Sequence, residues 1–193
     1  MTNTLIARVK WLAILPLLML AIHVSNVLLG GQLNQLGIVP RVTGSLLHVF
    51  TAPFIHSSFE HLFSNLVVLV VFSAFCLVRS VKFYFLSSLF IIGFSGLLVW
   101  IFGRTAHHIG ASGWVFGLWG LSIAMAWFDR KLWNIAVLLV VIVFYRGLVF
   151  GLWASDPRVS YEAHLAGVVA GVLWAYFYTR FQKRTPKTKM SGT

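Results

Sequence analysis

The stretch GASGWVFGLWG, residues 110–120, decides how this chain folds. Gly113, Gly117 and Gly120 recur at a spacing that puts them on one face of a helix. A glycine face lets a second helix approach closely, as helices in membranes often do. Ser112 stands at the start of the predicted helix, where free backbone N–H groups and the helix dipole favour an anion. Two interpretations are open: an N-cap serine followed by packing glycines, or a reactive serine.

The rest of the chain is too apolar for a soluble domain. Of its 193 residues, 59% are hydrophobic and 10% are charged, whereas soluble domains carry about 25% charged residues. Apolar runs of membrane-spanning length predict six spans, at 11–30, 58–78, 83–102, 112–128, 132–153 and 161–179. We therefore predict an all-α membrane protein with one six-span domain over residues 1–182. The basic tail, residues 183–193, is predicted to be cytoplasmic and disordered.

Lys and Arg residues indicate the orientation, because cytoplasmic loops carry an excess of them. One set of span ends holds eleven of these residues: Arg8, Lys10, Arg79, Lys82, Arg130, Lys131, Arg180, Lys183, Arg184, Lys187 and Lys189. The other set holds Arg41, Arg104 and Arg158. Both termini are therefore predicted to be cytoplasmic. The net charge of +11 is assigned to orientation and anionic lipid, since no basic nucleic-acid-binding module is present.

The first outer loop, residues 31–57, is long and half apolar. Its apolar side chains predict an element that lies in the outer membrane interface rather than a free loop: Leu46, Leu47, Val49, Phe50, Phe54 and Ile55.

The stretch HSSFEHLFSN, residues 56–65, places polar groups where the membrane makes them costly. His61 and Asn65 are four residues apart and share one helix face, while His56 lies in the preceding loop. Hydrogen bonding between helices is one interpretation. A metal site is not favoured, because the second residue is an amide rather than an imidazole. The single cysteine, Cys76, also excludes a multi-cysteine site.

The stretch EAHLAGVVAG, residues 162–171, supplies a second glycine face. His164 stands at its outer end, with Gly167 and Gly171 three and seven residues later. If the two glycine faces pack together, Ser112 and His164 come within hydrogen-bond reach, as a nucleophile and its base require. The alternative is that both faces serve packing alone and His164 is a satisfied core histidine.

The four acids do not complete a Ser-His-Asp triad. Each lies on the cytoplasmic side, in a loop, or on a helix face turned away: Asp129, Asp156, Glu162 and Glu60. The sequence therefore predicts a Ser–His dyad. Donors for a tetrahedral oxyanion are available from His61, Asn65 and the backbone N–H of Ser112.

Taken together, the motifs HSSFEHLFSN, GASG with its following glycines, and AHLAGVVAG closely resemble those of the rhomboid intramembrane serine proteases. The resemblance implies a six-helix rhomboid bundle in its minimal form, with a water-filled cavity open to the periplasm. It also implies a multi-pass protein of the bacterial inner membrane. The implied substrates are single-span membrane proteins, cut near the outer face of their transmembrane segment. Neither a cofactor nor a metal is expected.

The resemblance also implies residue roles. Ser112 is the expected nucleophile and His164 the expected general base, with His61 and Asn65 in the oxyanion hole. Structural roles near the site are expected for His56, Gly110, Gly113, Phe116 and Gly167. Phe116 departs from the tyrosine of several relatives, so its ring can stack but cannot donate a hydrogen bond. The Trp-Arg pair found in the first loop of some relatives is missing.

Two rival functions remain open. A catalytically silent relative that binds transmembrane helices as a chaperone or adaptor is expected to lack Ser112 or His164, and both are present. A small-molecule transporter calls for discontinuous helices or internal repeats, and the sequence shows neither.

Four polar residues outside these motifs also receive expectations. Arg146, inside the fifth span, is expected to have a structural role, either pointing outward or pairing with a carbonyl or an acid. His107 and His108 are each expected to be a solvated loop histidine, with contact of one of them to substrate or to carbonyls as the alternative. His23 is expected to be a hydrogen-bonding core residue.

Overall fold

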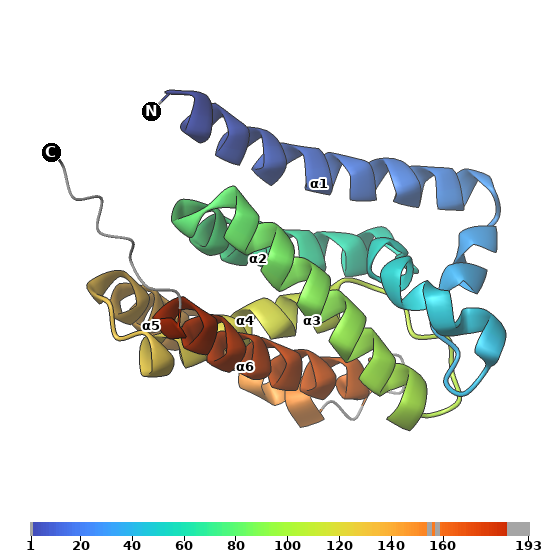
Figure 1. Cartoon of the computed structure of the whole chain (residues 1–193). Coiled ribbons are helices and arrows are strands. Elements are labelled where there is room, and N and C mark those ends of the chain that lie inside the picture. The colour runs from blue at the N-terminus through green and yellow to red at the C-terminus, as the bar shows by residue number, and fades with distance from the viewer. Residues whose placement is uncertain (1, 154–155, 157–158, 185–193) are drawn as a thin grey trace, which may run out of the picture.

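The computed structural model describes residues 2–153, 156 and 159–184, and helices joined by short turns and loops make up this part of the chain (Figure 1). It contains α1 (Thr2–Leu28), α2 (Phe59–Arg79), α3 (Val81–Phe102), α4 (Ser112–Phe128), α5 (Leu132–Tyr145) and α6 (Tyr161–Arg184). Three 3₁₀ helices lie between α1 and α2, namely η1 (Gln32–Leu36), η2 (Thr43–Phe50) and η3 (Ala52–Phe54), and η4 (Arg146–Trp153) follows α5. The all-α prediction is confirmed.

Several helices are suited to cross a membrane. Four apolar helical segments have the necessary length: Leu5–Leu28, Phe59–Arg79, Val81–Phe102 and Leu132–Trp153. The helix α4 is apolar but shorter, with 17 residues. The chain is thus a multi-pass membrane protein, while the count of six spans stays a prediction. The predicted fifth span differs in detail, because it is α-helical only to Tyr145 and continues as η4.

The helix α4 forms the centre of the bundle. Most of its residues are buried, and it packs against α2, α3, α5 and α6, whereas α1 lies along α2 at one side (Figure 1). A Cβ atom added at Gly167 or Gly171 would collide with the carbonyl oxygens of Gly113 and Gly117. The two backbones therefore touch along the glycine faces, and the predicted close packing of α4 and α6 is confirmed.

The first loop is folded onto the end of the bundle that holds the starts of α2, α4 and α6. Ile38 and His108 form an isolated antiparallel bridge, with N–H···O distances of 2.9 and 2.8 Å. The Arg41 guanidinium donates to the Gly103 carbonyl at 2.8 Å, at the end of α3. Leu47 and Phe50 remain exposed. The loop is thus docked on the bundle, and its place in the membrane interface stays a prediction.

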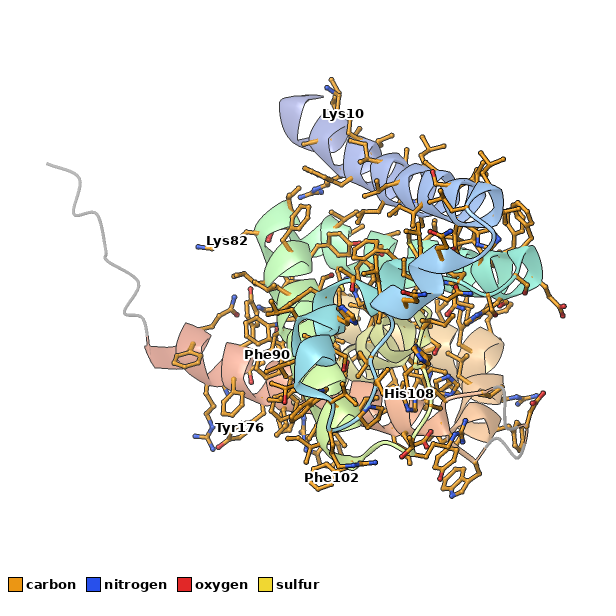
Figure 2. All side chains as sticks on the ribbon, turned by 90° about the vertical axis from the view of Figure 1, so that its right-hand side faces the viewer. Lys10, Lys82, Phe90, Phe102, His108 and Tyr176 are labelled. Atoms are coloured by element: carbon orange, nitrogen blue, oxygen red, sulfur yellow. The ribbon has the colours of Figure 1, made fainter. Side chains whose placement is uncertain are left out.

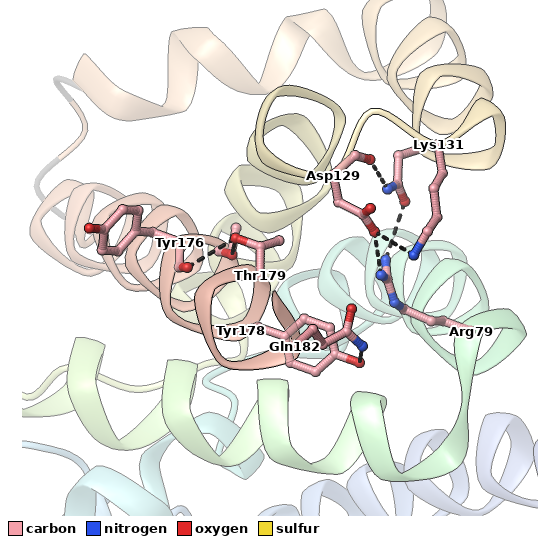
Figure 3. Close-up of polar contacts among 9 residues, drawn as sticks. Arg79, Asp129, Lys131, Tyr176, Tyr178, Thr179 and Gln182 are labelled. Carbon is pink, nitrogen blue, oxygen red and sulfur yellow. Dashed lines mark hydrogen bonds and ion pairs between the residues drawn. The ribbon is translucent and has the colours of Figure 1, made fainter. Parts of the chain in front are cut away.

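The opposite end of the bundle carries an ion cluster (Figure 3). Asp129, after α4, accepts from Arg79 at 2.5 Å and from Lys131 at 3.2 Å. Burial disfavours the Asp129 carboxylate, but the hydrogen bonds from Arg79 and Lys131 outweigh it and hold the pKa below its usual value. The cluster fastens the ends of α2, α4 and α5 together. The described ends of α1 and α6 lie at this end of the bundle too (Figure 1).

The predicted tail begins at residue 183, and α6 reaches Arg184. Residues 185–193 of that tail lie outside the described residues.

Candidate active site

Ser112 is the first residue of α4 and is not its N-cap. The N-cap is Ala111, which makes no side-chain capping bond. The first helical hydrogen bond runs from the Val115 N–H to the Ala111 carbonyl at 2.9 Å, so the N–H groups of residues 112–114 have no partner within the helix. The Ser112 hydroxyl is half-buried and has no hydrogen-bond partner among the described residues. The helix start is thus uncapped, with a serine at its positive end.

His164 is held by two contacts near the N-terminal end of α6. Its Nδ1 lies 2.8 Å from the Gly151 carbonyl oxygen. Its ring stacks on Phe116, with the ring centroids 4.0 Å apart and an interplanar angle of 7°. A carbonyl can only accept, so Nδ1 carries the proton and Nε2 of the neutral ring carries the lone pair. His164 therefore has one satisfied nitrogen and one that can act as a base.

The helix packing brings the surroundings of Ser112 and His164 together. A Cβ atom on Gly113 would lie 3.2 Å from the Ala163 carbonyl oxygen, and these residues are the direct neighbours of Ser112 and His164. Phe116, which stacks on His164, lies one turn after Ser112 and shares its helix face. The structure contains no hydrogen bond between Ser112 and His164 themselves. Such bonds are often long in enzymes without substrate.

His61 lies beside the turn that precedes α4. Gly110 has φ 107° in this turn, which favours glycine. A Cβ atom on Gly110 would lie 2.6 Å from His61 Nε2. The other ring nitrogen of His61 lies 3.3 Å from the Ser57 hydroxyl. Asn65 follows one turn later, and its amide donates to the His61 carbonyl at 2.7 Å. The structure thus places His61 against the turn that precedes Ser112. One N–H of the Asn65 amide is already bonded to a carbonyl of α2.

His56 connects three parts of the chain. It is fully buried, and its Nε2 accepts the Ala111 N–H at 3.3 Å. Its carbonyl accepts from His23 Nδ1, on α1, at 3.1 Å, which confirms the expectation that His23 bonds within the core. Burial, together with the nearby His61, lowers the pKa of His56 to about 4. His56 therefore fastens α1 and the first loop to the start of α4.

His108 is not the solvated loop histidine that was expected, and its contact with a carbonyl agrees with the alternative expectation. The side chain is buried, with Nδ1 2.6 Å from the Ser160 hydroxyl and Nε2 2.9 Å from the Arg104 carbonyl. Figure 2 shows it among the first loop and neighbouring helices. The cause is the bridge to Ile38, which draws the loop inward. His107, in contrast, is exposed, as expected.

Arg146 is exposed at the start of η4, where it has no hydrogen bond or ion pair to any described residue. Its expected pairing with a carbonyl or an acid is therefore not observed, and its outward position agrees with the alternative expectation.

Sequence reasoning also missed two backbone carbonyls. The Gly151 carbonyl accepts from His164, and the Ala52 carbonyl accepts from the Gly110 N–H at 2.9 Å. Residue identity does not indicate which backbone carbonyl accepts a given hydrogen bond, because every residue has one. The only available signal was Gly151 itself. A side chain there would meet Phe116 at 2.7 Å.

The fold and this arrangement define a polytopic membrane protein with a serine and a histidine on two contacting helices. The Rhomboid domain model matches residues 43–181, and the chain belongs to the rhomboid family. An uncharacterized protein of Mycobacterium tuberculosis is 30% identical over 184 residues, covering 91% of this chain and 77% of that protein. An uncharacterized Mycobacterium leprae protein is 27% identical, with 84% and 68% covered. The chloroplastic rhomboid-like protein 11 of Arabidopsis thaliana is 31% identical, with 68% and 52% covered.

Proposed function

We propose that this rhomboid-family protein is an intramembrane serine endopeptidase with a Ser112–His164 dyad. One observation carries the proposal: His164 is bound through Nδ1 to the Gly151 carbonyl and stacked on Phe116, which leaves Nε2 as a base beside the helix start that bears Ser112. Family membership supports the same conclusion, since rhomboid proteins include intramembrane serine proteases.

In the proposed reaction, Nε2 of His164 takes the proton of the Ser112 hydroxyl while Oγ attacks the peptide carbonyl carbon. The new C–O bond leaves a negative charge on the carbonyl oxygen. The N–H of Ser112, the His61 imidazole and an Asn65 amide N–H stabilise this oxyanion. His164 then donates its proton to the leaving amine as the C–N bond breaks. Water, deprotonated by His164, hydrolyses the resulting ester.

The proposed substrates are single-span membrane proteins cut at the periplasmic side of a bacterial inner membrane. Carbonyls within a helix are already hydrogen-bonded, so a substrate helix must unwind before Ser112 can attack. Segments with glycine or proline, which unwind most easily, should therefore be cut faster than leucine-rich helices. The proposed chemistry uses side chains and backbone alone, with no metal or cofactor.

Labelling of the detergent-purified protein with a fluorophosphonate tests the proposed nucleophile. We expect phosphonylation that maps by mass spectrometry to Ser112 and disappears in Ser112→Ala and His164→Ala. Ser122→Ala is the matched control, because Ser122 lies in the same helix and its hydroxyl is bonded to the Leu118 carbonyl at 2.8 Å. Labelling of another serine, or undiminished labelling in His164→Ala, would contradict the dyad.

A further inference from the structure

The contact between His164 and Gly151 joins two elements that are 13 residues apart in the chain. His164 lies in α6, whereas Gly151 belongs to the 3₁₀ helix η4 that follows α5. The Nδ1···O distance is 2.8 Å. No acid among the described residues hydrogen-bonds to the imidazole, and this carbonyl occupies the place that a carboxylate takes in a triad.

A single hydrogen bond of this kind selects the tautomer of the ring. Nδ1 must carry the proton to donate to the carbonyl, so the lone pair resides on Nε2. With the opposite tautomer, the lone pair would face Gly151 and Nε2 would carry a hydrogen. The ring could then not accept the proton of Ser112.

The element that carries this carbonyl presents much of its apolar surface outward from the described helices. Leu152 is the buried residue of η4, while Phe150 and Trp153 are 80% and 74% exposed. Gly151 itself fits closely, since a Cβ there would meet Phe116 at 2.7 Å and His164 Nδ1 at 3.4 Å. The position of η4 thus sets the Nδ1 contact of His164, whereas the stack on Phe116 comes from α4.

We propose that the Gly151 carbonyl is the third, positioning member of the catalytic centre, so that His164 is a competent base only while η4 is seated. The inference rests on the proposed function and adds a positioning role for η4. Displacement of η4 removes the Nδ1 acceptor and releases the ring to its other tautomer.

Two changes weaken the bond in different ways. Gly151→Ala inserts a methyl group against Phe116, with Gly147→Ala as the matched control, because a Cβ at Gly147 meets nothing within 4 Å. An α-hydroxy acid in place of Leu152 turns the Gly151 carbonyl into an ester carbonyl, a weaker acceptor, without added bulk. The same replacement at Leu148 is its control, since it alters the Gly147 carbonyl.

The principal measurement is the ¹⁵N spectrum of labelled histidine in detergent micelles, which separates protonated from unprotonated ring nitrogens. Comparison with His164→Gln assigns the His164 signals. We expect the Nδ1–H tautomer in the wild type and both controls, and a mixture of tautomers in Gly151→Ala and in the Leu152 ester. The rate of phosphonylation should fall about 3- to 10-fold in the ester, as expected for one weakened hydrogen bond. The double variant Gly151→Ala/Phe116→Leu should regain the Nδ1–H tautomer.

The spectrum does not depend on activity, so it separates the two proposals. A wild-type His164 that carries its proton on Nε2 overturns the inference. So does a Gly151→Ala or ester variant that keeps the Nδ1–H tautomer while labelling falls, since packing alone then explains the loss. If the wild type is not labelled at Ser112 at all, the proposed function fails, whatever the tautomer.

Discussion

Phe116 restrains the His164 ring through a stack of two nearly parallel rings. Phe116→Leu removes the aromatic face, and we expect the cleavage rate to fall about 2- to 10-fold, as the loss of one aromatic pair implies. Phe116→Tyr keeps the stack and should stay within about 2-fold of the wild type. Initial rates on a single-span substrate test this. Equal activity in the Leu and Tyr variants would show that the stack does not position the base.

His56 makes stability depend on pH. Its pKa of about 4 in the folded protein lies below the ordinary histidine value of about 6.5. Between pH 4 and pH 6.5, His56 is protonated in the unfolded chain and neutral in the folded protein. The contribution of His56 to stability is therefore complete above pH 6.5 and is lost as the pH falls toward 4. The slope is at most about 1.4 kcal/mol per pH unit.

His56→Asn tests this dependence, because asparagine does not titrate. We expect the stability difference between wild type and variant, measured by unfolding in detergent, to be largest near pH 7 and to shrink toward pH 5. A difference that stays constant over this range would assign the effect of His56 to packing alone.

The site residues could be predicted from the sequence because polar side chains are rare and costly in an apolar, membrane-spanning chain. Ser112, His164 and His61 were predicted on this ground. In the structure, residues next to Ser112 contact both His164 and His61 at one end of α4. The hydrogen bonds of His108 and His164 were not readable. Each depends on a partner outside the motif, namely Ser160 or the Gly151 carbonyl, whose approach is set by tertiary packing.

At the scale of elements, the contact of α4 and α6 depends on the absence of side chains. Gly171→Ala places a methyl group on the Gly117 carbonyl, which is backbone and cannot move aside without separating the helices. We expect a loss of about 1–3 kcal/mol of stability, seen as a lower melting temperature in detergent. Gly44→Ala, in open space, is the control. Equal melting temperatures for the two variants would contradict this account of the packing.

Helix boundaries were predicted best where composition changes abruptly. The predicted span 112–128 coincides with α4 (Ser112–Phe128), because a glycine turn precedes it and charged residues follow it. The predicted span 132–153 did not show the change to a 3₁₀ helix at Arg146. The segment after that change is still largely apolar, and hydropathy reports burial in lipid and not the number of residues per turn.

At the scale of the whole molecule, the charge distribution predicts an orientation that labelling can test. In a Cys76→Ala background, Thr105→Cys lies at the predicted outer end and Arg130→Cys at the opposite end, and both positions are exposed. We expect a membrane-impermeant maleimide to label Thr105→Cys on intact cells, and Arg130→Cys only after permeabilisation. The reverse pattern would place the candidate active site on the cytoplasmic side.

The most direct test is cleavage of a labelled single-span membrane protein by the purified chain. Wild type, Ser112→Ala, His164→Ala and the control Ser122→Ala are compared in the same detergent. The account predicts cleavage by the wild type and by Ser122→Ala, and a loss of at least about 1,000-fold in both dyad variants. Cleavage that persists in Ser112→Ala or His164→Ala would contradict the central claim that these two residues perform the reaction.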